Sequence, residues 1–260
     1  MIDTHAHLND KVFTGQEEQY ISLAKEQGVN YIVNVGWDLR SSKNCATLSD
    51  KFSNAYFVAG VHPSDCQTVD NGLIDQLLQL SKHEKALAIG EIGLDYHYGK
   101  GNEETQKLAF DAQIKLAHEA GLPFVVHSRE ASKDMADILR ANKNLLQKGF
   151  LMHCYSESLE QAKIYLDLGG YFAFGGAITF KNAKKDEIIK YIPKDRLLCE
   201  TDCPYMTPVP YRGSINHPAL IYLVYQKMEQ ILEISHTEFV GLMRDNAQRL
   251  FFKMKLKSDN

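Results

Sequence analysis

The sequence has no long hydrophobic run, no close cysteine pair and no strong excess of charge of one sign. No run approaches the roughly 18 apolar residues that a membrane-spanning helix needs. The five cysteines include no C-x-x-C pair, and the start of the chain shows neither a basic region nor an apolar leader. These absences favour reduced thiols in a cytoplasmic protein without membrane association. The sequence also lacks a G-x-S-x-G motif, so nothing supports nucleophilic serine chemistry.

The bulk composition is that of an ordinary globular protein. Of 260 residues, 44% are hydrophobic and 24% are charged, and the net charge is −4. This charge gives no overall nucleic-acid footprint, although a local basic patch at a cleft remains compatible with it. No linker, repeat or low-complexity stretch divides the chain, so we expect one domain over residues 1–260. No obligate protein partner is evident.

Short apolar runs alternate with amphipathic helical patterns along the chain. Each run has four to six residues and is mostly apolar, which is typical of parallel strands buried on both faces. The eight runs span residues 2–5, 31–35, 56–61, 87–91, 124–127, 150–154, 171–174 and 197–201. Eight strand–helix units in about 250 residues predict a single (β/α)8 TIM barrel. A doubly wound open sheet uses the same units, but the first run is not followed by G-x-G-x-x-G.

Four helical patterns are the clearest, and they cover residues 105–123, 156–170, 217–234 and 236–252. The first stops at Gly121 with a proline just beyond it, a common C-terminal signal. The second offers Ser158 and Gln161 as a capping box. Ser235 or Thr237 is expected to cap the last helix.

His5 and His7 stand two residues apart in the first run. On a strand, both side chains leave the same face, about 7 Å apart along the backbone. Asp3 shares this parity and is expected to orient one imidazole from behind. Taken alone, the H-x-H pattern is more often that of two surface histidines at a polar terminus.

Further ligand-type residues stand where apolar runs meet their loops. They are Glu91, His127, His153 and Asp202. The carboxyl ends of all eight barrel strands converge on one mouth, so residues distant in sequence become neighbours there. Together with the two N-terminal histidines they provide four imidazoles and two carboxylates.

This set is too large for one tetrahedral zinc with an open position, and it suits two divalent ions bridged by a carboxylate. Glu91, from the middle of the strand order, is the expected bridge. Asp202 is expected to bind the first ion and to orient or deprotonate the attacking water. The first ion would be held by His5 and His7, and the second by His127 and His153. Zn, Mn and Mg all accept mixed nitrogen and oxygen ligands, and four imidazoles favour a transition metal.

Seven motifs of the chain occur in the order and spacing of a known family. They are "DTHAHL", "GVHP", "GEIGLDY", "LPFVVHSREA", "HCYS", "ETDCPYMTP" and "NAQRLF". From Asp3 to about Phe251 the sequence resembles the TatD-type metal-dependent hydrolases, which are often described as deoxyribonucleases. The resemblance implies a (β/α)8 barrel with two metal sites that hydrolyses DNA phosphodiesters, as a 3′-to-5′ exonuclease on single strands. It implies the same six ligands, with Glu91 as the bridge.

Four positions depart from the family pattern, and one of them, Ala6 in place of a frequent cysteine, is without consequence. Glu157 replaces a glycine near the expected phosphate path, and Ser214 and His217 stand where a basic residue and a glutamate are more usual. These changes leave the metal ligands intact and bear on substrate preference.

Substrate contacts are expected around the mouth. Arg129, two residues after His127, carries a planar fork suited to a phosphate, and Arg212 after the eighth strand offers the same group. His62 either touches substrate or makes a loop hydrogen bond. The mouth tyrosines that could stack on bases, or simply pack within their loops, are Tyr96, Tyr98, Tyr155 and Tyr205.

Three hypotheses therefore stand. The first is a two-metal hydrolase of single-stranded DNA, with Glu91 and Asp202 as catalytic groups. The second is a metal-dependent hydrolase of a non-DNA ester or amide, for example an aminoacyl-tRNA deacylase. The third is a metal-binding protein without catalysis. The complete ligand set with a candidate base counts against it, because a non-catalytic site has no need for open coordination positions.

Overall fold

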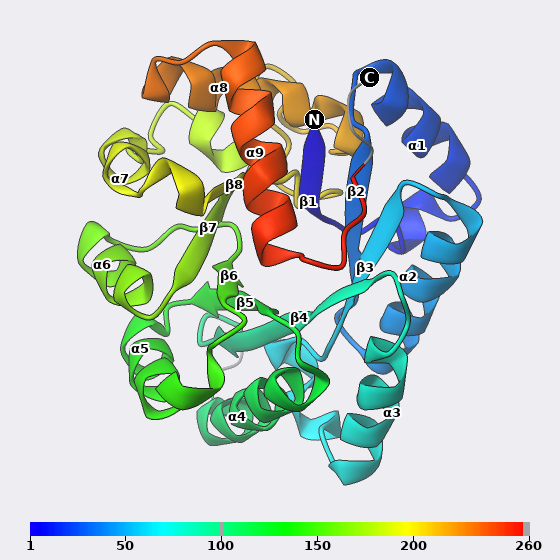
Figure 1. Cartoon of the computed structure of the whole chain (residues 1–260), viewed down its shortest axis with the longest axis vertical. Helices are drawn as coiled ribbons and strands as arrows, with labels where there is room; N and C mark the ends of the chain where they lie inside the picture. The colour runs from blue at the N-terminus through cyan, green and yellow to red at the C-terminus, as the bar shows by residue number, and fades with distance from the viewer. Residues whose placement is uncertain (99–100, 257–260) are drawn as a thin grey trace.

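Eight parallel strands form one sheet whose order follows the chain from β1 to β8 (Figure 1). The structure, a computed structural model, describes residues 1–98 and 101–256. The predicted domain also includes residues 99–100 and 257–260, which lie outside the described residues. The strands are β1 Ile2–Ala6, β2 Tyr31–Val35, β3 Ala55–Ala59, β4 Ala86–Asp95, β5 Phe124–Arg129, β6 Phe150–Met152, β7 Gly170–Phe174 and β8 Leu197–Cys199.

The sheet returns to its first strand, which confirms the predicted barrel rather than an open sheet. Ala6 pairs with Cys203 in a parallel bridge just beyond β8. The Thr4 hydroxyl donates to the carbonyl oxygen of Cys199 at 2.9 Å, and the Asp202 N–H donates to the His5 carbonyl at 2.9 Å. The contacts between β8 and β1 therefore also fix the segment that carries Asp202 beside the histidine strand.

Helices surround the barrel on its outer face, as Figure 1 shows. They are α1 Glu17–Glu26, α2 Leu39–Lys51, α3 Asn71–Ser81, α4 Glu103–Ala120, α5 Ser132–Ala141, α6 Leu159–Asp167, α7 Asp186–Tyr191, α8 Ile221–Leu232 and α9 His236–Leu250. Short 3-10 turns lie at η1 Lys11–Phe13, η2 Pro63–Thr68, η3 Lys143–Leu145, η4 Gly176–Thr179, η5 Lys194–Arg196 and η6 Pro218–Leu220. In the part of the chain that is described, no helix combines the length and apolar character needed to cross a membrane.

The helix ends follow the sequence signals with one exception. Helix α4 ends at Ala120 and is capped by Gly121, whose φ of 66° is left-handed and suits glycine. Helix α9 is capped by Ser235, whose side chain accepts the N–H of Glu238. At α6, Ser158 accepts the N–H of Gln161, but the side-chain oxygen of Gln161 has no partner among the described residues. Only half of the predicted capping box is therefore formed.

Strand β4 differs most from its predicted bounds. It runs over ten residues, Ala86–Asp95, because the chain stays paired with β5 as far as Asp95 opposite Arg129. Glu91 therefore lies within the strand rather than at its end. Strands β6 and β8 are shorter than predicted, and they leave His153 and Asp202 in the segments that follow.

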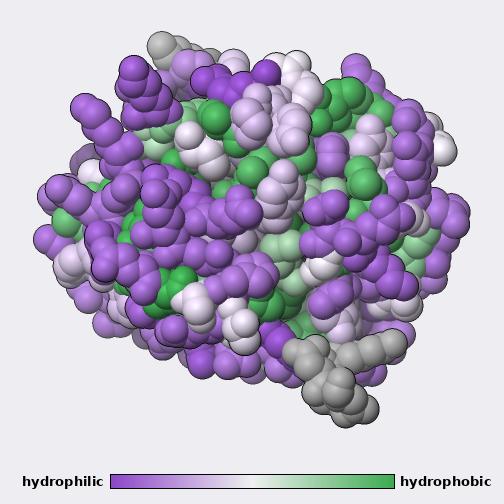
Figure 2. Space-filling view, turned by 90° about the horizontal axis from the view of Figure 1, so that it is seen from above, coloured by the Kyte–Doolittle hydropathy of each residue, from purple (hydrophilic) through white to green (hydrophobic). Residues whose placement is uncertain are grey.

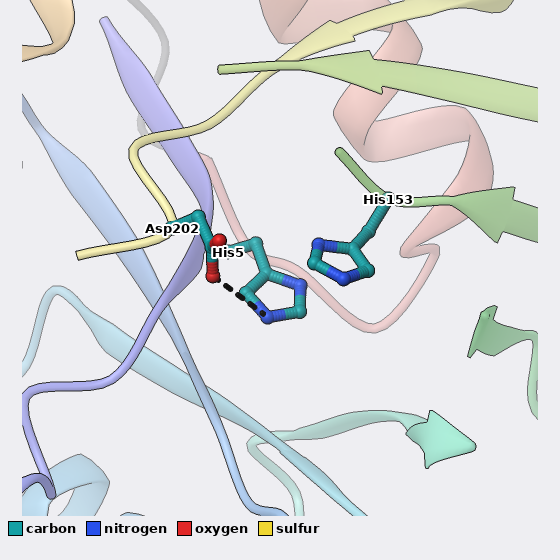
Figure 3. A group of neighbouring side chains, drawn as sticks. All are labelled: His5, His153 and Asp202. Carbon is teal, nitrogen blue, oxygen red and sulfur yellow. Dashed lines mark ion pairs between the residues drawn. The ribbon is translucent and has the colours of Figure 1, made fainter. Parts of the chain in front are cut away.

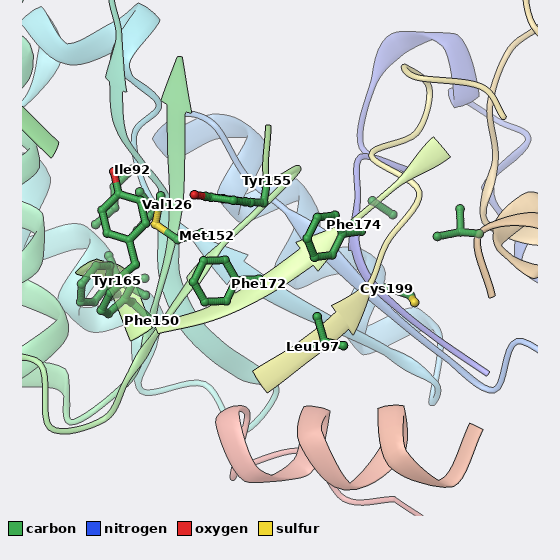
Figure 4. Packing of buried hydrophobic residues seen from close by; sticks show 14 of the residues in the cluster. Ile92, Val126, Phe150, Met152, Tyr155, Tyr165, Phe172, Phe174, Leu197 and Cys199 are labelled. Carbon is green, nitrogen blue, oxygen red and sulfur yellow. The ribbon is translucent and has the colours of Figure 1, made fainter. Parts of the chain in front are cut away.

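Two apolar layers hold the barrel. The inner layer fills the barrel with side chains such as Val33, Val125 and Leu198, and it continues into Leu250 and Phe251 at the end of α9. The outer layer lies between strands and helices, and Figure 4 shows part of it around Phe150 and Phe172. Because strand starts and the α9 end share the inner layer, the amino-terminal end of the barrel is closed by apolar packing. The space-filling view of Figure 2 shows a mainly hydrophilic face with smaller hydrophobic patches.

Candidate metal centre

The six predicted ligands come together at the carboxyl ends of the strands. Groups of three whose ligand atoms all lie within 4.8 Å of one another include His5 with His7 and Glu91, and His5 with His153 and Asp202. Figure 3 shows the second group, with each side chain entering from a different part of the barrel. His5 belongs to β1, and His153 and Asp202 follow β6 and β8. Sequence separations of up to about two hundred residues are thus bridged by the closed sheet.

Glu91 lies at the middle of the cluster. Its Oε2 is 3.4 Å from His5 Nε2 and 3.9 Å from His7 Nε2. Its Oε1 is 2.8 Å from both His127 Nδ1 and His153 Nε2. The two oxygens of one carboxylate therefore face two different pairs of imidazoles.

Asp202 lies on the side of the two N-terminal histidines. Its Oδ1 is 3.5 Å from His7 Nε2 and 3.9 Å from His5 Nε2, and Figure 3 marks the second contact. The His5 ring also stacks on the His153 ring, with centroids 4.0 Å apart. His5 therefore joins the two sides of the cluster.

Backbone contacts fix the orientation of His7. Its Nδ1 lies 2.8 Å from the carbonyl oxygen of Val35. A carbonyl can only accept, so Nδ1 carries the proton and Nε2 presents its lone pair to the centre. The N–H of His7 donates to the Cys203 carbonyl at 2.9 Å. The end of β1 is thus held between β2 and the segment after β8.

Two carboxylates that the sequence analysis missed lie behind the imidazoles. Asp95 Oδ2 is 3.0 Å from His127 Nε2, which leaves Nδ1 of that ring for the centre. Glu200 is fully buried, accepts the N–H of Cys154, and places its Oε1 3.5 Å from His153 Nδ1. Partners of this kind orient metal-binding imidazoles. The sequence did offer one sign of Glu200: it stands two residues before Asp202, so in an extended chain both side chains leave the same face.

Asp3 does not contact an imidazole, contrary to the sequence-based expectation. Its carboxylate accepts the N–H of Thr201 at 2.9 Å and also bonds the Thr201 hydroxyl. It further accepts the backbone N–H of His5 at 3.3 Å. Burial raises the pKa of Asp3 to about 7, although these hydrogen bonds oppose the shift. Asp3 therefore ties β1 to β8 and acts on the cluster only through the backbone.

The electrostatics of the cluster depend on the carboxylates and imidazoles acting together. Burial alone would raise the pKa of Glu91, but the imidazoles, His153 first, hold it well below its usual range. Burial likewise opposes a charge on His153, yet Glu91 and Glu200 raise its pKa well above the ordinary value. For Asp202, burial raises the pKa, but the contacts with His7, His153 and His5 together outweigh burial and lower it.

The donor set fits divalent cations. Within residues 1–98 and 101–256, the ion-pair partners of Glu91 and Asp202 are all imidazoles. The raised pKa of His153 shows that the buried carboxylates draw positive charge to the cluster, and a bound cation can supply that charge in place of a proton. His5 Nε2 and His7 Nε2 lie 3.1 Å apart, close to the roughly 3.3 Å expected of two nitrogens bound to one tetrahedral zinc.

A family model described as "TatD related DNase" matches residues 2–252. The chain belongs to this family. The uncharacterized metal-dependent hydrolase YabD of Bacillus subtilis is 39% identical over 252 residues, covering 96% of this chain and 98% of the relative. The corresponding YcfH of Escherichia coli K12 is 33% identical and covers 96% and 95%. The crystal structure of the Escherichia coli TatD homologue YjjV superposes with a TM-score of 0.90 at 30% identity, covering 97% of this chain and 98% of that one.

The protein is therefore a metal-dependent hydrolase of the TatD family with a TIM-barrel fold. Two predicted substrate contacts of this TatD barrel lie close to the centre or at its mouth. His62 Nε2 is 3.8 Å from Glu91 Oε1, and its ring meets the His127 ring at 4.5 Å. His62 lies in the loop after β3 and makes the predicted loop hydrogen bond, because its Nδ1 accepts the Ser64 N–H at 3.1 Å. Its Nε2 lies among the ligand atoms of Glu91 and His127. Arg129 is exposed at the end of β5, and its guanidinium lies 4.8 Å from the Tyr98 ring.

The other two predicted contacts are not brought to the six ligands. Arg212 is exposed, and its guanidinium lies over the Phe180 ring at 4.0 Å. Tyr155 is only 5% exposed and donates its hydroxyl to the Ser158 carbonyl at 2.7 Å. Figure 4 shows its ring in the apolar layer near Phe172. The structure therefore places Tyr155 in the core of the TatD barrel rather than facing the mouth.

Glu157, the departure from the TatD pattern, is engaged by its neighbours. Ser128 donates its hydroxyl to Glu157 Oε1, and Tyr165 donates to Oε2 at 2.8 Å. The ammonium group of Lys185 lies close by and donates to the Glu157 carbonyl at 2.9 Å. These bonds hold the carboxylate beside β5 and α6.

Proposed function

We propose that this TatD-family protein is a two-metal phosphodiesterase that removes nucleotides from the 3′ end of single-stranded DNA. The observation that carries the two-metal part is Glu91, whose oxygens face His5 and His7 on one side and His127 and His153 on the other. A carboxylate placed between two sets of nitrogen ligands suits a bridge between ions a few ångströms apart. The number and identity of the ions belong to this proposal.

When bound, two divalent cations would activate a water and stabilise the charge that builds on the phosphate. The chain supplies the proton acceptor. Asp202 is ionised because the contact with His7 lowers its pKa against the effect of burial, and its side chain remains partly open to the mouth, at 14% exposure. It is thus placed to orient the attacking water and to accept a proton from it.

Arg129 is the proposed phosphate contact. Its guanidinium stacks on Tyr98, and in the described part of the chain it has no carboxylate partner. The fork of donors therefore remains available to a phosphate, which it can bind with two parallel hydrogen bonds. The position of Arg129 two residues after His127 puts this fork at the mouth.

The choice of DNA rests on the family description and on the motifs that resemble TatD deoxyribonucleases. The experiment that tests it uses the metal-loaded protein and single-stranded DNA labelled at either end. We expect stepwise, chelator-sensitive loss of nucleotides from the 3′ end. The Asp202→Asn variant should lose at least about 100-fold in rate, as expected when a general base is removed.

The matched control is Asp167→Asn, which makes the same chemical change at an exposed position on α6. It should cleave at the wild-type rate. If the loaded protein cleaves no DNA with Mg, Mn or Zn but hydrolyses an aminoacyl ester or an amide, the reaction class stands and DNA is the wrong substrate. If Asp202→Asn cleaves at full rate, a contaminating nuclease is the source.

A further inference from the structure

Two aromatic rings contact His7 at the mouth of the barrel. Trp37, which follows β2, has its ring centroid 5.6 Å from that of His7, at an interplanar angle of 68°. Tyr205, which follows β8, lies 6.3 Å from it at 66°. Both distances are within the range of direct edge-to-face contact. Aromatic side chains from two separate loops therefore lie beside the same proposed ligand.

The backbone around Trp37 is held in place on both sides. The Trp37 N–H donates to Ser41 Oγ at 2.9 Å, and its carbonyl accepts the His62 N–H at 2.8 Å. The preceding carbonyl, of Gly36, accepts the N–H of Glu91 at 3.0 Å. The turn that carries the indole is thus tied directly to the strand of the bridging carboxylate, so the ring needs little ordering when a ligand binds.

Both rings also remain open to solvent. Trp37 is partly exposed, and in the described chain its indole N–H donates to no protein atom. Tyr205 is 55% exposed, and the same loop exposes Met206, Tyr211 and Ile215. Large aromatic rings left in water at a functional mouth indicate a contact surface.

The chemistry of this side of the mouth favours a flat neutral group over a phosphate. The Tyr205 hydroxyl donates to Asp10 Oδ2 at 3.4 Å, so a carboxylate lies beside the ring. The guanidinium of Arg129 lies instead by Tyr98, on the β4–β5 side. A carboxylate therefore lies beside the Tyr205 ring, whereas the guanidinium of Arg129, which has no carboxylate partner among the described residues, lies on the other side of the mouth.

We propose that Trp37 and Tyr205 form an aromatic subsite that stacks on a base of the bound strand next to the bond being cleaved. This inference rests on the proposed function. It adds how the protein would hold the base of the nucleotide, for which the proposed function names no residue. Stacking on aromatic rings accepts every base because each has a π face. The subsite thus gives affinity for nucleic acid without sequence preference.

Cleavage kinetics provide the first test, on single strands that end in a normal nucleotide or in an abasic sugar. With the normal end, Trp37→Ala should raise KM about 10-fold with kcat changed less than about threefold, as expected for one lost stacking contact. Trp37→Phe should restore most of the affinity. With the abasic end, wild type and Trp37→Ala should show equal KM. Metal content is measured for each variant to show that the centre is intact.

The control is Tyr191→Ala, which removes an exposed aromatic ring at the end of α7, away from His7. It should leave both KM values unchanged. If Trp37→Ala changes KM equally for the normal and the abasic end, the ring does not read a base and the inference is overturned. Normal nuclease activity alongside that result would leave the proposed function standing.

A second measurement is independent of turnover, because Trp37 is the only tryptophan in the chain. Its fluorescence should be quenched saturably by a deoxynucleoside monophosphate and not by deoxyribose 5-phosphate, and Tyr205→Ala should weaken the nucleotide response about 10-fold. If the protein cleaves no DNA but shows this base-dependent quenching, the subsite is supported and the proposed nuclease activity fails. Equal responses to both ligands, or none, would refute the subsite.

Discussion

Glu91 lies among the imidazoles of the centre, with Oε2 facing His5 and His7 and Oε1 close to His127 and His153. Glu91→Gln keeps the size of the side chain but removes its charge and one of its acceptor oxygens, so it cannot bridge two cations. We expect the bound metal per chain to fall after dialysis, and the hydrolytic rate to drop at least about 100-fold. Elemental analysis and a rate assay on the same sample measure both.

Glu187→Gln is the matched control for this change, because Glu187 is exposed in the first turn of α7. It should retain wild-type metal content and rate. Full metal content in Glu91→Gln would show that Glu91 is not a ligand and would remove the basis of the two-metal proposal.

The imidazoles on the β5–β6 side predict a pH dependence of metal binding. Burial lowers the pKa of His127 and His153, but the neighbouring carboxylates outweigh it and raise both values. A protonated imidazole cannot bind a metal, so metal and protons compete for these rings. Because both pKa values are raised, this competition begins at a pH above the ordinary histidine pKa of about 6.5. Apparent metal affinity should therefore fall steadily as pH is lowered through neutrality.

Isothermal titration of the metal-free protein at a series of pH values measures this dependence, with protons released on binding. Circular dichroism at each pH serves as the control that the fold persists. An affinity independent of pH between neutral and mildly acidic conditions would contradict the prediction.

Single residues were predictable where a polar side chain interrupts an apolar run. His127 and His153 each stand out in this way, and the structure brings both to Glu91. Trp37 and Asp95 were missed because they lie beyond the predicted strand ends. Tyr155 was misplaced because position in a loop does not reveal that its ring turns into the core.

At the scale of elements, β1 is anchored at both of its ends by different means. Its start is held by Tyr225 on α8, whose hydroxyl accepts the Ile2 N–H at 3.0 Å and donates to the Ile2 carbonyl at 3.1 Å. Its other end carries His5 and His7. The start of the strand is therefore fixed by hydrogen bonds to α8. Its other end is held by hydrogen bonds to β2 and to the segment after β8, and a bound metal would add to these.

Tyr225→Phe should separate these two anchors. It keeps the ring but leaves the backbone groups of Ile2 buried without partners, which should lower the free energy of unfolding by about 1–3 kcal/mol. Tyr191→Phe, at an exposed site, should have no measurable effect in the same urea titration. Amide exchange should show that chelation loosens the His5–His7 end while the Ile2 end stays protected in wild type. Equal loosening of both ends would mean that the metal alone holds the strand.

Element type was predictable from the apolar runs, whereas element length was not. Strand β4 continues for four residues beyond Glu91 because β5 pairs with it as far as Arg129. Such pairing depends on the neighbouring strand and leaves no local pattern. The half-formed capping box at α6 was not predictable either, since the side-chain oxygen of Gln161 bonds nothing among the described residues.

For the whole molecule, the count of alternating runs predicted eight strand–helix units, but closure rests on contacts that no run displays. The bridge between Ala6 and Cys203 and the bond from Thr4 to the Cys199 carbonyl join the two ends of the sheet. These contacts are what bring Asp202 to the N-terminal histidines. The proposed metal centre therefore depends on closure of the barrel as well as on the identity of its ligand residues.

The apolar residues that close the amino-terminal end of the barrel lie far from the candidate metal centre, so we expect them to affect stability more than metal binding. Phe251 is fully buried in the inner apolar layer, while the proposed metal ligands lie at the opposite, carboxyl ends of the strands. Phe251→Ala should leave a cavity and lower the free energy of unfolding by about 3–5 kcal/mol. Metal affinity measured well below the melting temperature should change less than about threefold, because distant sites act independently.

The neighbouring Phe252, which is 48% exposed, supplies the matched control. Phe252→Ala should cost less than about 1 kcal/mol in the same urea titration, since its ring is half exposed and lies under the Lys148 ammonium group. If Phe251→Ala fails to fold, Phe251→Leu provides a smaller cavity and a proportionally smaller loss. A fall in metal affinity that tracks the loss of stability across these variants would show that the inner layer transmits strain from the α9 end to the mouth.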